Sequence, residues 1–187
     1  MRLKTNVPRC KHGHTKEEHP ACFRNAPEDK YPNDVVIGIV DIEVLPMVVY
    51  SWNIYTQYIS PKQIIKPLTF LSWAGKILNK SEIFSDVLTP KEALSRDDYR
   101  ITKSCWEFMS KCDIIIGHNI SNYDKKLTNT FFLKHGLPPI KYIDVDTLLV
   151  ARNNFRFSSN KLDAINKELG IPDKLVNEGL ELWTKCD

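Results

Sequence analysis

The sequence lacks several features that would each point to a particular class of protein. Its apolar runs fall well short of the ~20 residues needed to cross a bilayer, and its first six residues lead into no apolar stretch. We therefore expect no membrane segment, no signal peptide and no membrane partner. Repeats and low-complexity tracts are also missing. The net charge of +3, from 26 basic and 23 acidic residues, is too small to indicate nucleic-acid binding by itself. We expect a cytoplasmic protein.

Cysteines are too few and too unevenly placed for a disulfide framework. There are five, an odd number. Cys10 and Cys22 lie among three of the five histidines, whereas Cys105, Cys112 and Cys186 stand in apolar or helix-like contexts. In a reducing compartment the first pair suggests metal binding, and the other three suggest buried or incidental thiols.

The composition that is present is that of a globular protein with one domain and a small appendage. The 187 residues are 42% hydrophobic and 26% charged. Residues 1–34 are polar, with almost no apolar periodicity, and end in a turn-rich connector. We therefore divide the chain into a Cys/His-rich zinc-binding module with its connector, 1–34, and a folded domain, 35–187.

Apolar patterning from residue 35 onward predicts an α/β domain: a mixed sheet with helices on both faces. The β-branched run 35–40 is typical of a strand buried on both faces. We expect a helix to begin at Thr147, capped by Asp146, and another to be capped by Ser159 and to end at Leu169. The other expected strands are 48–55, 68–73, 113–117 and 140–145, and the other expected helices are 91–111 and 124–134.

Three carboxylates carry the most specific signal. Asp41 and Glu43 directly follow the first apolar run, and side chains two residues apart on a strand point to the same side. Taken alone, this pair is more often a solvated strand end than a site. Asp124 follows another short apolar strand and begins a helix. Three neighbouring carboxylates repel one another unless a cation lies between them, and oxygen ligands without His or Cys favour Mg²⁺ or Mn²⁺.

Asp41-x-Glu43, followed by Asn119-x-x-x-Tyr123-Asp124, resembles the first two motifs of the DEDD-type (DnaQ-like) 3′–5′ exonucleases, which have a ribonuclease H-like fold. The segments 143–148, 157–163 and 60–74 are similar to a phage and bacterial branch of that family. The resemblance covers residue 35 to the end of the chain. It implies a bacterial or phage-infected cell, and a polymerase or another replication protein as partner.

The resemblance also implies an activity: removal of nucleotides from a 3′ end by a two-metal mechanism, on single-stranded or frayed DNA in preference to RNA. Asp41 would bridge two metal ions, Glu43 would hold one and orient the attacking water, and Asp124 would hold the other. Asn119 and Tyr123 would shape the site of the terminal nucleotide. Trp52, Tyr55 and Trp73 are candidate stacking platforms for bases, although their spacing favours core packing for at least two of them.

The family's third motif, a final Asp preceded by Tyr or His, has no counterpart before the chain ends at Asp187. We therefore expect a C-terminally incomplete exonuclease domain. The substitutes for the missing acid are Asp144, Asp146 and Asp163, of which Asp146 is expected to cap a helix and Asp163 to be exposed or structural. The alternative function is a catalytically weak or silent nucleic-acid-binding module of the same fold.

The segment 10–22 predicts a structural zinc site. Cys10-x₃-His14 and His19-x₂-Cys22 give two short chelating pairs, with His12 competing with His14 for the second position. The segment has too few apolar residues to fold alone, so bound zinc would supply its stability. The alternative is a His-rich arm with incidental cysteines.

Overall fold

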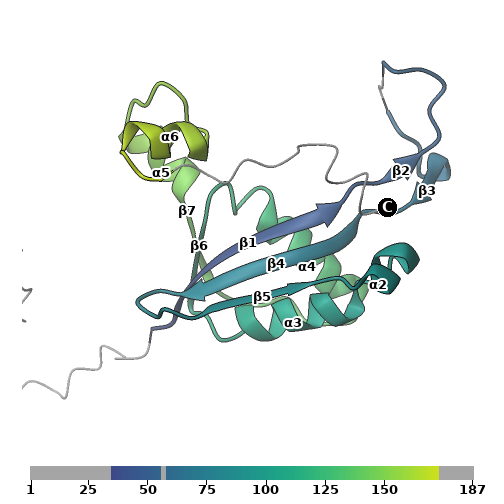
Figure 1. The fold of residues 1–187 in the computed structure, drawn as a ribbon, viewed down its shortest axis with the longest axis horizontal. Helices are drawn as coiled ribbons and strands as arrows, with labels where there is room; N and C mark the ends of the chain where they lie inside the picture. The colour runs from purple at the N-terminus through teal and green to yellow at the C-terminus, as the bar shows by residue number, and fades with distance from the viewer. Residues whose placement is uncertain (1–34, 56–57, 173–187) are drawn as a thin grey trace, which may run out of the picture. The chain divides into compact units, whose positions relative to one another are not determined.

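The computed structural model describes residues 35–55 and 58–172, and it confirms the mixed α/β sheet. A five-stranded sheet has the order β5-β4-β1-β6-β7, in which β4 pairs antiparallel with β1 and β5, and β6 pairs parallel with β1 and β7 (Figure 1). The strands are β1 (Ile37–Leu45), β4 (Thr69–Ile77), β5 (Ile83–Val87), β6 (Ile114–Gly117) and β7 (Ile143–Asp146).

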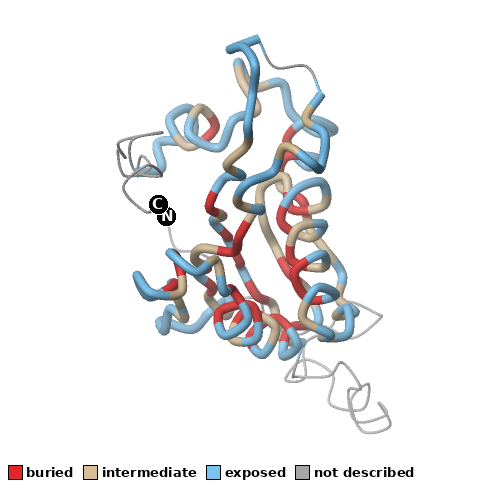
Figure 2. The backbone as a smooth tube through the Cα atoms, turned by 90° about the vertical axis from the view of Figure 1, so that its right-hand side faces the viewer, coloured by how far each residue is buried: buried red, intermediate tan, exposed pale blue. Residues whose placement is uncertain are grey.

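Helices pack against the face of the sheet that carries the even-numbered residues of β1. Val40 and Ile42 are buried there with side chains from α3 (Tyr99–Met109) and α4 (Asp124–Lys134). Helix α3 lies so close to β4 that a Cβ on Gly75 would come within 2.5 Å of the Phe108 ring. Figure 2 shows the buried positions gathered in the interior of the domain, with exposed positions around them. The core therefore lies between one face of the sheet and the helices α3 and α4.

The odd-numbered residues of β1 lie on the opposite face. Ile39 is 40% exposed, and Asp41 and Glu43 are exposed as well. The prediction that strand 35–40 is buried on both faces is therefore wrong. The strand also continues to Leu45, so Asp41 and Glu43 lie within it and not after it. Alternation explains the difference: the acids occupy only the open face and leave the buried face apolar.

The predicted helix 91–111 is in fact two helices, α2 (Pro90–Ser95) and α3. Arg96 has a left-handed backbone conformation (φ 55°), which ends α2, and Asp98 precedes the first residue of α3. Thr89 and Glu92 form a capping box at the start of α2. Composition alone did not reveal this break, because the segment contains no Gly and no internal Pro after Pro90.

Two predictions about strands also need correction. The predicted strand 48–55 is reduced to β2 (Val48–Val49), which pairs with β3 (Ile64–Lys66) as a separate two-stranded sheet. The edge strand β5 was not predicted at all, although residues 83–87 alternate between exposed and partly buried. We call residues 46–55 and 58–67, which hold β2, the short 3₁₀ helix η1 (Pro61–Gln63) and β3, the arm.

The remaining elements agree well with the sequence. The predicted strands 68–73, 113–117 and 140–145 correspond to β4, β6 and β7, and helix α4 has the predicted bounds. Asp146 caps α5 (Thr147–Asn154) by accepting from Leu148 N–H at 2.9 Å. Helix α6 (Leu162–Glu168) follows Lys161 and not Ser159, whose hydroxyl accepts from Lys161 N–H. The segment 10–22 and the residues after 172 lie outside the described residues.

No helix within residues 35–55 and 58–172 is long and apolar enough to span a membrane.

A buried carboxylate connects the two main helices to the sheet. Asp98 has no exposed surface. Its Oδ1 accepts from Lys134 Nζ at 2.8 Å and contacts His135 Nε2 at 2.7 Å, and its Oδ2 accepts from Phe70 N–H at 3.0 Å. Burial opposes ionisation, yet the hydrogen bonds from Lys134, Phe70 and His135 lower the pKa of Asp98 below its ordinary value. The start of α3, the end of α4 and β4 are thus held by one ionised side chain.

We predict that Asp98→Ala lowers the free energy of unfolding by about 3–5 kcal/mol, because it leaves the half-buried Lys134 ammonium and the Phe70 N–H without their partner. Asp97→Ala, which removes the exposed neighbouring carboxylate, should cost less than about 1 kcal/mol. Urea unfolding at pH 7 measures both values, and equal losses for the two variants would contradict the role given to Asp98.

Candidate active site

The first two acids of the candidate site share one face of one strand. Asp41 and Glu43 lie opposite Ala74 and Ser72 of β4 in the β1–β4 register. A register shift follows immediately between Glu43 and Val44. Because both side chains belong to the open face of the sheet, they point to the same side, as the sequence predicts.

The third acid comes from a different element and reaches the same strand. Asp124 is the first residue of α4 and is only 9% exposed. The Ile42 backbone N–H lies near enough to its carboxylate to lower the pKa of Asp124. The β1–β6 ladder runs only from Ile37 to Ile39, so this approach lies beyond the point where β6 stops pairing with β1. The start of α4 is therefore beside the residue that separates Asp41 from Glu43.

The charges of Asp41 and Glu43 act on Asp124. Burial, and after it these negative charges, raise the pKa of the Asp124 carboxyl to about 6, although the backbone N–H groups of Asp124 itself and of Ile42 oppose this shift. A carboxyl so placed gains from a nearby cation more than an isolated one does. Asp124 therefore lies within the electrostatic influence of the two acids of β1.

Tyr123 lies near these carboxylates, whereas Asn119 contributes backbone hydrogen bonds that shape the turn before α4. Tyr123 is 47% exposed, and its pKa is raised by burial and then by the charges of Glu43 and Asp124. Asn119 has a left-handed conformation (φ 66°) and its carbonyl accepts from Tyr123 N–H at 3.0 Å. Its own N–H donates to Asp146 Oδ1 at 2.9 Å. Asn119 thus forms the turn that places Tyr123 and Asp124.

The substitutes considered for a fourth acid have other partners. Asp146 is 5% exposed and accepts from the backbone N–H groups of Asn119, Ser121 and Leu148. Asp144 accepts from Lys125 Nζ at 2.5 Å and from the Ser121 hydroxyl at 2.6 Å. Asp163 is exposed and accepts from the N–H of the residue that follows it. Asp146 is the helix cap that the sequence predicts.

A hollow of about 540 Å³ lies beside the two acids of β1 on the open face. Ser72, Ser85 and other small side chains of β4 and β5 line it together with Asp41 and Glu43. Sequence reasoning did not place Ser72 or Ser85 near the acids. The missed strand β5 is the reason, because only its pairing with β4 brings Ser85 to this face.

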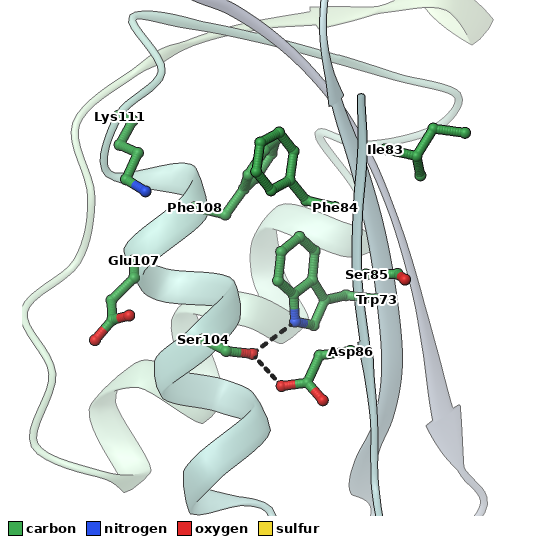
Figure 3. Close-up of a pocket in the computed structure, with 9 residues that line it drawn as sticks. All are labelled: Trp73, Ile83, Phe84, Ser85, Asp86, Ser104, Glu107, Phe108 and Lys111. Carbon is green, nitrogen blue, oxygen red and sulfur yellow. Dashed lines mark hydrogen bonds between the residues drawn. The ribbon is translucent and has the colours of Figure 1, made fainter. Parts of the chain in front are cut away.

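The three candidate stacking residues have different environments. Trp73 is 6% exposed, its indole N–H donates to Ser104 Oγ at 2.9 Å, and that hydroxyl donates to Asp86 at 2.7 Å (Figure 3). Trp73 is thus a core residue. Trp52 and Tyr55 are 98% and 78% exposed, so the expectation that at least two of the three pack in the core is wrong. The reason is that the predicted strand 48–55 ends at Val49.

All three acids offer oxygen ligands, a donor set that suits Mg²⁺ or Mn²⁺. Among residues 35–55 and 58–172, no group of three His, Cys, Asp or Glu side chains is assembled as a ready metal site. Asp41 and Glu43 are exposed on the open face of the sheet. The donors fit the ion, and the raised pKa of Asp124 shows the unfavourable charge that such an ion would relieve.

No protein-family model matches the chain. The chain is 40% identical over 58 residues to the PolC-type DNA polymerase III of Ureaplasma parvum serovar 3 (strain ATCC 700970). That match covers 31% of this chain and 4% of the relative. The chain therefore corresponds in length to a small part of this relative.

The fold is similar to part of the family B DNA polymerase from the hyperthermophilic archaeon Pyrobaculum calidifontis. The TM-score is 0.55 at 16% sequence identity, and the match covers 84% of this chain and 22% of that chain. At this identity the likeness shows the fold alone. The sheet, with its three antiparallel strands followed by two parallel ones, is compatible with a ribonuclease H-like fold.

The raised pKa of Asp124 predicts a pH-dependent effect of Asp124→Asn on stability. Ionising a carboxyl whose folded-state pKa lies above its unfolded value costs the folded state free energy as pH rises. This cost is absent below about pH 3 and complete above about pH 7. In EDTA, we compare the free energy of unfolding of Asp124→Asn with that of the wild type. We expect this difference to rise by about 1–3 kcal/mol in favour of the variant between these two pH limits. Denaturant unfolding at both pH values tests this, with exposed Asp163→Asn as control; parallel curves for wild type and Asp124→Asn would contradict it.

Proposed function

We propose that the domain is a metal-dependent 3′–5′ exonuclease that hydrolyses phosphodiester bonds at single-stranded or frayed DNA ends. The observation that carries the proposal is that the charges of Asp41 and Glu43, on β1, act on Asp124 at the start of α4. Two DNA polymerases share sequence or fold with the chain, which supports DNA as substrate and a replication protein as partner. The resemblance to DnaQ-like exonucleases links these observations to one chemistry.

In this proposal each residue has a defined task. Asp41, Glu43 and Asp124 hold Mg²⁺ or Mn²⁺, which when bound activates a water and stabilises the leaving oxygen. The Ile42 N–H lies near the Asp124 carboxylate and favours its ionised form. Tyr123, half exposed beside Glu43, borders the position of the terminal nucleotide together with the Asn119 turn.

The second candidate function is a catalytically weak or silent nucleic-acid-binding module of the same fold. The observation that favours it is the engagement of Asp144 and Asp146 by Lys125, Ser121 and backbone N–H groups, which leaves neither as a fourth metal ligand. Three carboxylates neutralise two divalent ions less completely than four, so one of the two metal sites would be weak.

We predict that Asp41→Ala lowers the rate of 3′-nucleotide release at least about 100-fold, because metal coordination contributes several kcal/mol to the transition state. The assay is the laddering of 5′-labelled single-stranded DNA with Mg²⁺ or Mn²⁺, with a matched RNA as second substrate. Asp97→Ala, an exposed aspartate of the loop before α3, should keep the wild-type rate. Metal-independent cleavage would overturn the nuclease proposal. Binding without cleavage would support the silent module.

We further propose that the N-terminal segment holds a structural zinc ion through Cys10, His14, His19 and Cys22. Metal analysis of the purified full-length protein should give about one zinc per chain, and Cys22→Ser should lose it. Cys186→Ser, outside the segment, is the control. A trace of zinc that Cys22→Ser leaves unchanged would refute the site.

A further inference from the structure

The arm displays aromatic rings that nothing in the described structure covers. Tyr50, Trp52, Tyr55 and Tyr58 are 72%, 98%, 78% and 97% exposed, all within nine residues of sequence. Single exposed apolar side chains are common, but several large aromatic rings together mark a surface that binds something.

The base of the arm is held firmly, so the rings project from a defined platform. Gln63 closes the base: its backbone carbonyl accepts from Tyr50 N–H at 2.9 Å, and its side-chain amide donates to the Tyr50 carbonyl at 2.8 Å. Arg96 donates to the carbonyls of Pro46 and Pro67, the two residues where the arm joins the main sheet. Together these bonds anchor both strands of the arm.

The charge of the arm is of one sign. Residues 46–67 contain two lysines, Lys62 and Lys66, and no Asp or Glu, in a chain with 23 acidic residues. Basic groups close in sequence to exposed aromatic rings suit single-stranded nucleic acid, whose phosphates attract the positive charge and whose bases stack on the rings.

The arm also continues from the strands that carry the candidate site. Strand β1 passes from Glu43 through Leu45 into β2, and β3 leads back into β4 (Figure 1). At about 3.3 Å per residue, the five residues from Glu43 to Val48 span at most about 17 Å. A strand with its 3′ end at the acids therefore has its upstream nucleotides within reach of the arm.

We propose that the arm is a stacking platform for single-stranded nucleic acid, with Trp52 as its main ring and Tyr50, Tyr55 and Tyr58 beside it. This inference rests on the proposed function for the direction of the strand, but the binding itself does not depend on cleavage. The arm holds nucleotides upstream of the 3′ end and thereby determines how long a substrate must be for full affinity.

The test is the affinity of the full-length protein for fluorescein-labelled oligo(dT), measured by anisotropy in EDTA so that no hydrolysis occurs. We expect Trp52→Leu to weaken binding about 5- to 100-fold, and Trp52→Phe to stay within about threefold of wild type, because only the ring is needed. Leu133→Ala, an exposed apolar residue of α4, should have no effect. For a trinucleotide all four proteins should bind alike.

Two results would overturn the proposal. One is wild-type affinity of Trp52→Leu for the long oligonucleotide, which would leave the arm as a surface for a protein partner. The other is equal weakening by Trp52→Leu and Trp52→Phe, which would exclude stacking. Failure of the nuclease proposal looks different: no cleavage by wild type in Mg²⁺, with binding in EDTA that still depends on Trp52. Because Trp52 is almost fully exposed, matching circular dichroism spectra should show that both variants fold.

Discussion

The repulsion among the negative charges of Asp41, Glu43 and Asp124 is the constraint on which the arrangement of the site depends. Strand β1 is paired along its length with β4, but β6 leaves it after Ile39. Asp124 lies beside β1 beyond that point, at the start of α4. Burial and the two neighbouring negative charges raise the pKa of its carboxyl, and the backbone N–H groups of Asp124 and Ile42 oppose this shift only in part. A divalent cation would relieve the unfavourable charge that remains.

A second buried carboxylate, that of Asp98, has partners that stabilise the fold. Asp98 is more deeply buried than Asp124, yet its pKa falls where that of Asp124 rises. The difference lies in the partners: Asp98 meets Lys134, His135 and a backbone N–H, whereas Asp124 meets two further acids. Burial alone therefore does not single out a candidate functional carboxylate in this fold, whereas burial together with neighbouring like charges distinguishes Asp124 from Asp98.

The two faces of the main sheet have different surroundings. One face packs against α3 and α4 so closely that Gly75 has no room for a side chain. The other face is exposed along β1, β4 and β5 and carries the acids, the hollow beside them and the small side chains of Ser72 and Ser85. The arm, which continues from β1 and leads back into β4, adds exposed aromatic rings to the domain.

The sequence by itself determined the elements with strong local signals: helix α4 with its bounds, the Asp146 cap, and the placement of Asp41 and Glu43 on one side of a strand. Period-two alternation and helix-start chemistry act over a few residues, so they can be read without the fold. Tertiary structure decided the rest. The length of β1, the pairing of β5 and the break at Arg96 depend on partners distant in sequence. The exposure of Trp52 and the burial of Trp73 depend on such partners as well. An indole ring is buried or exposed according to which other parts of the chain pack against it.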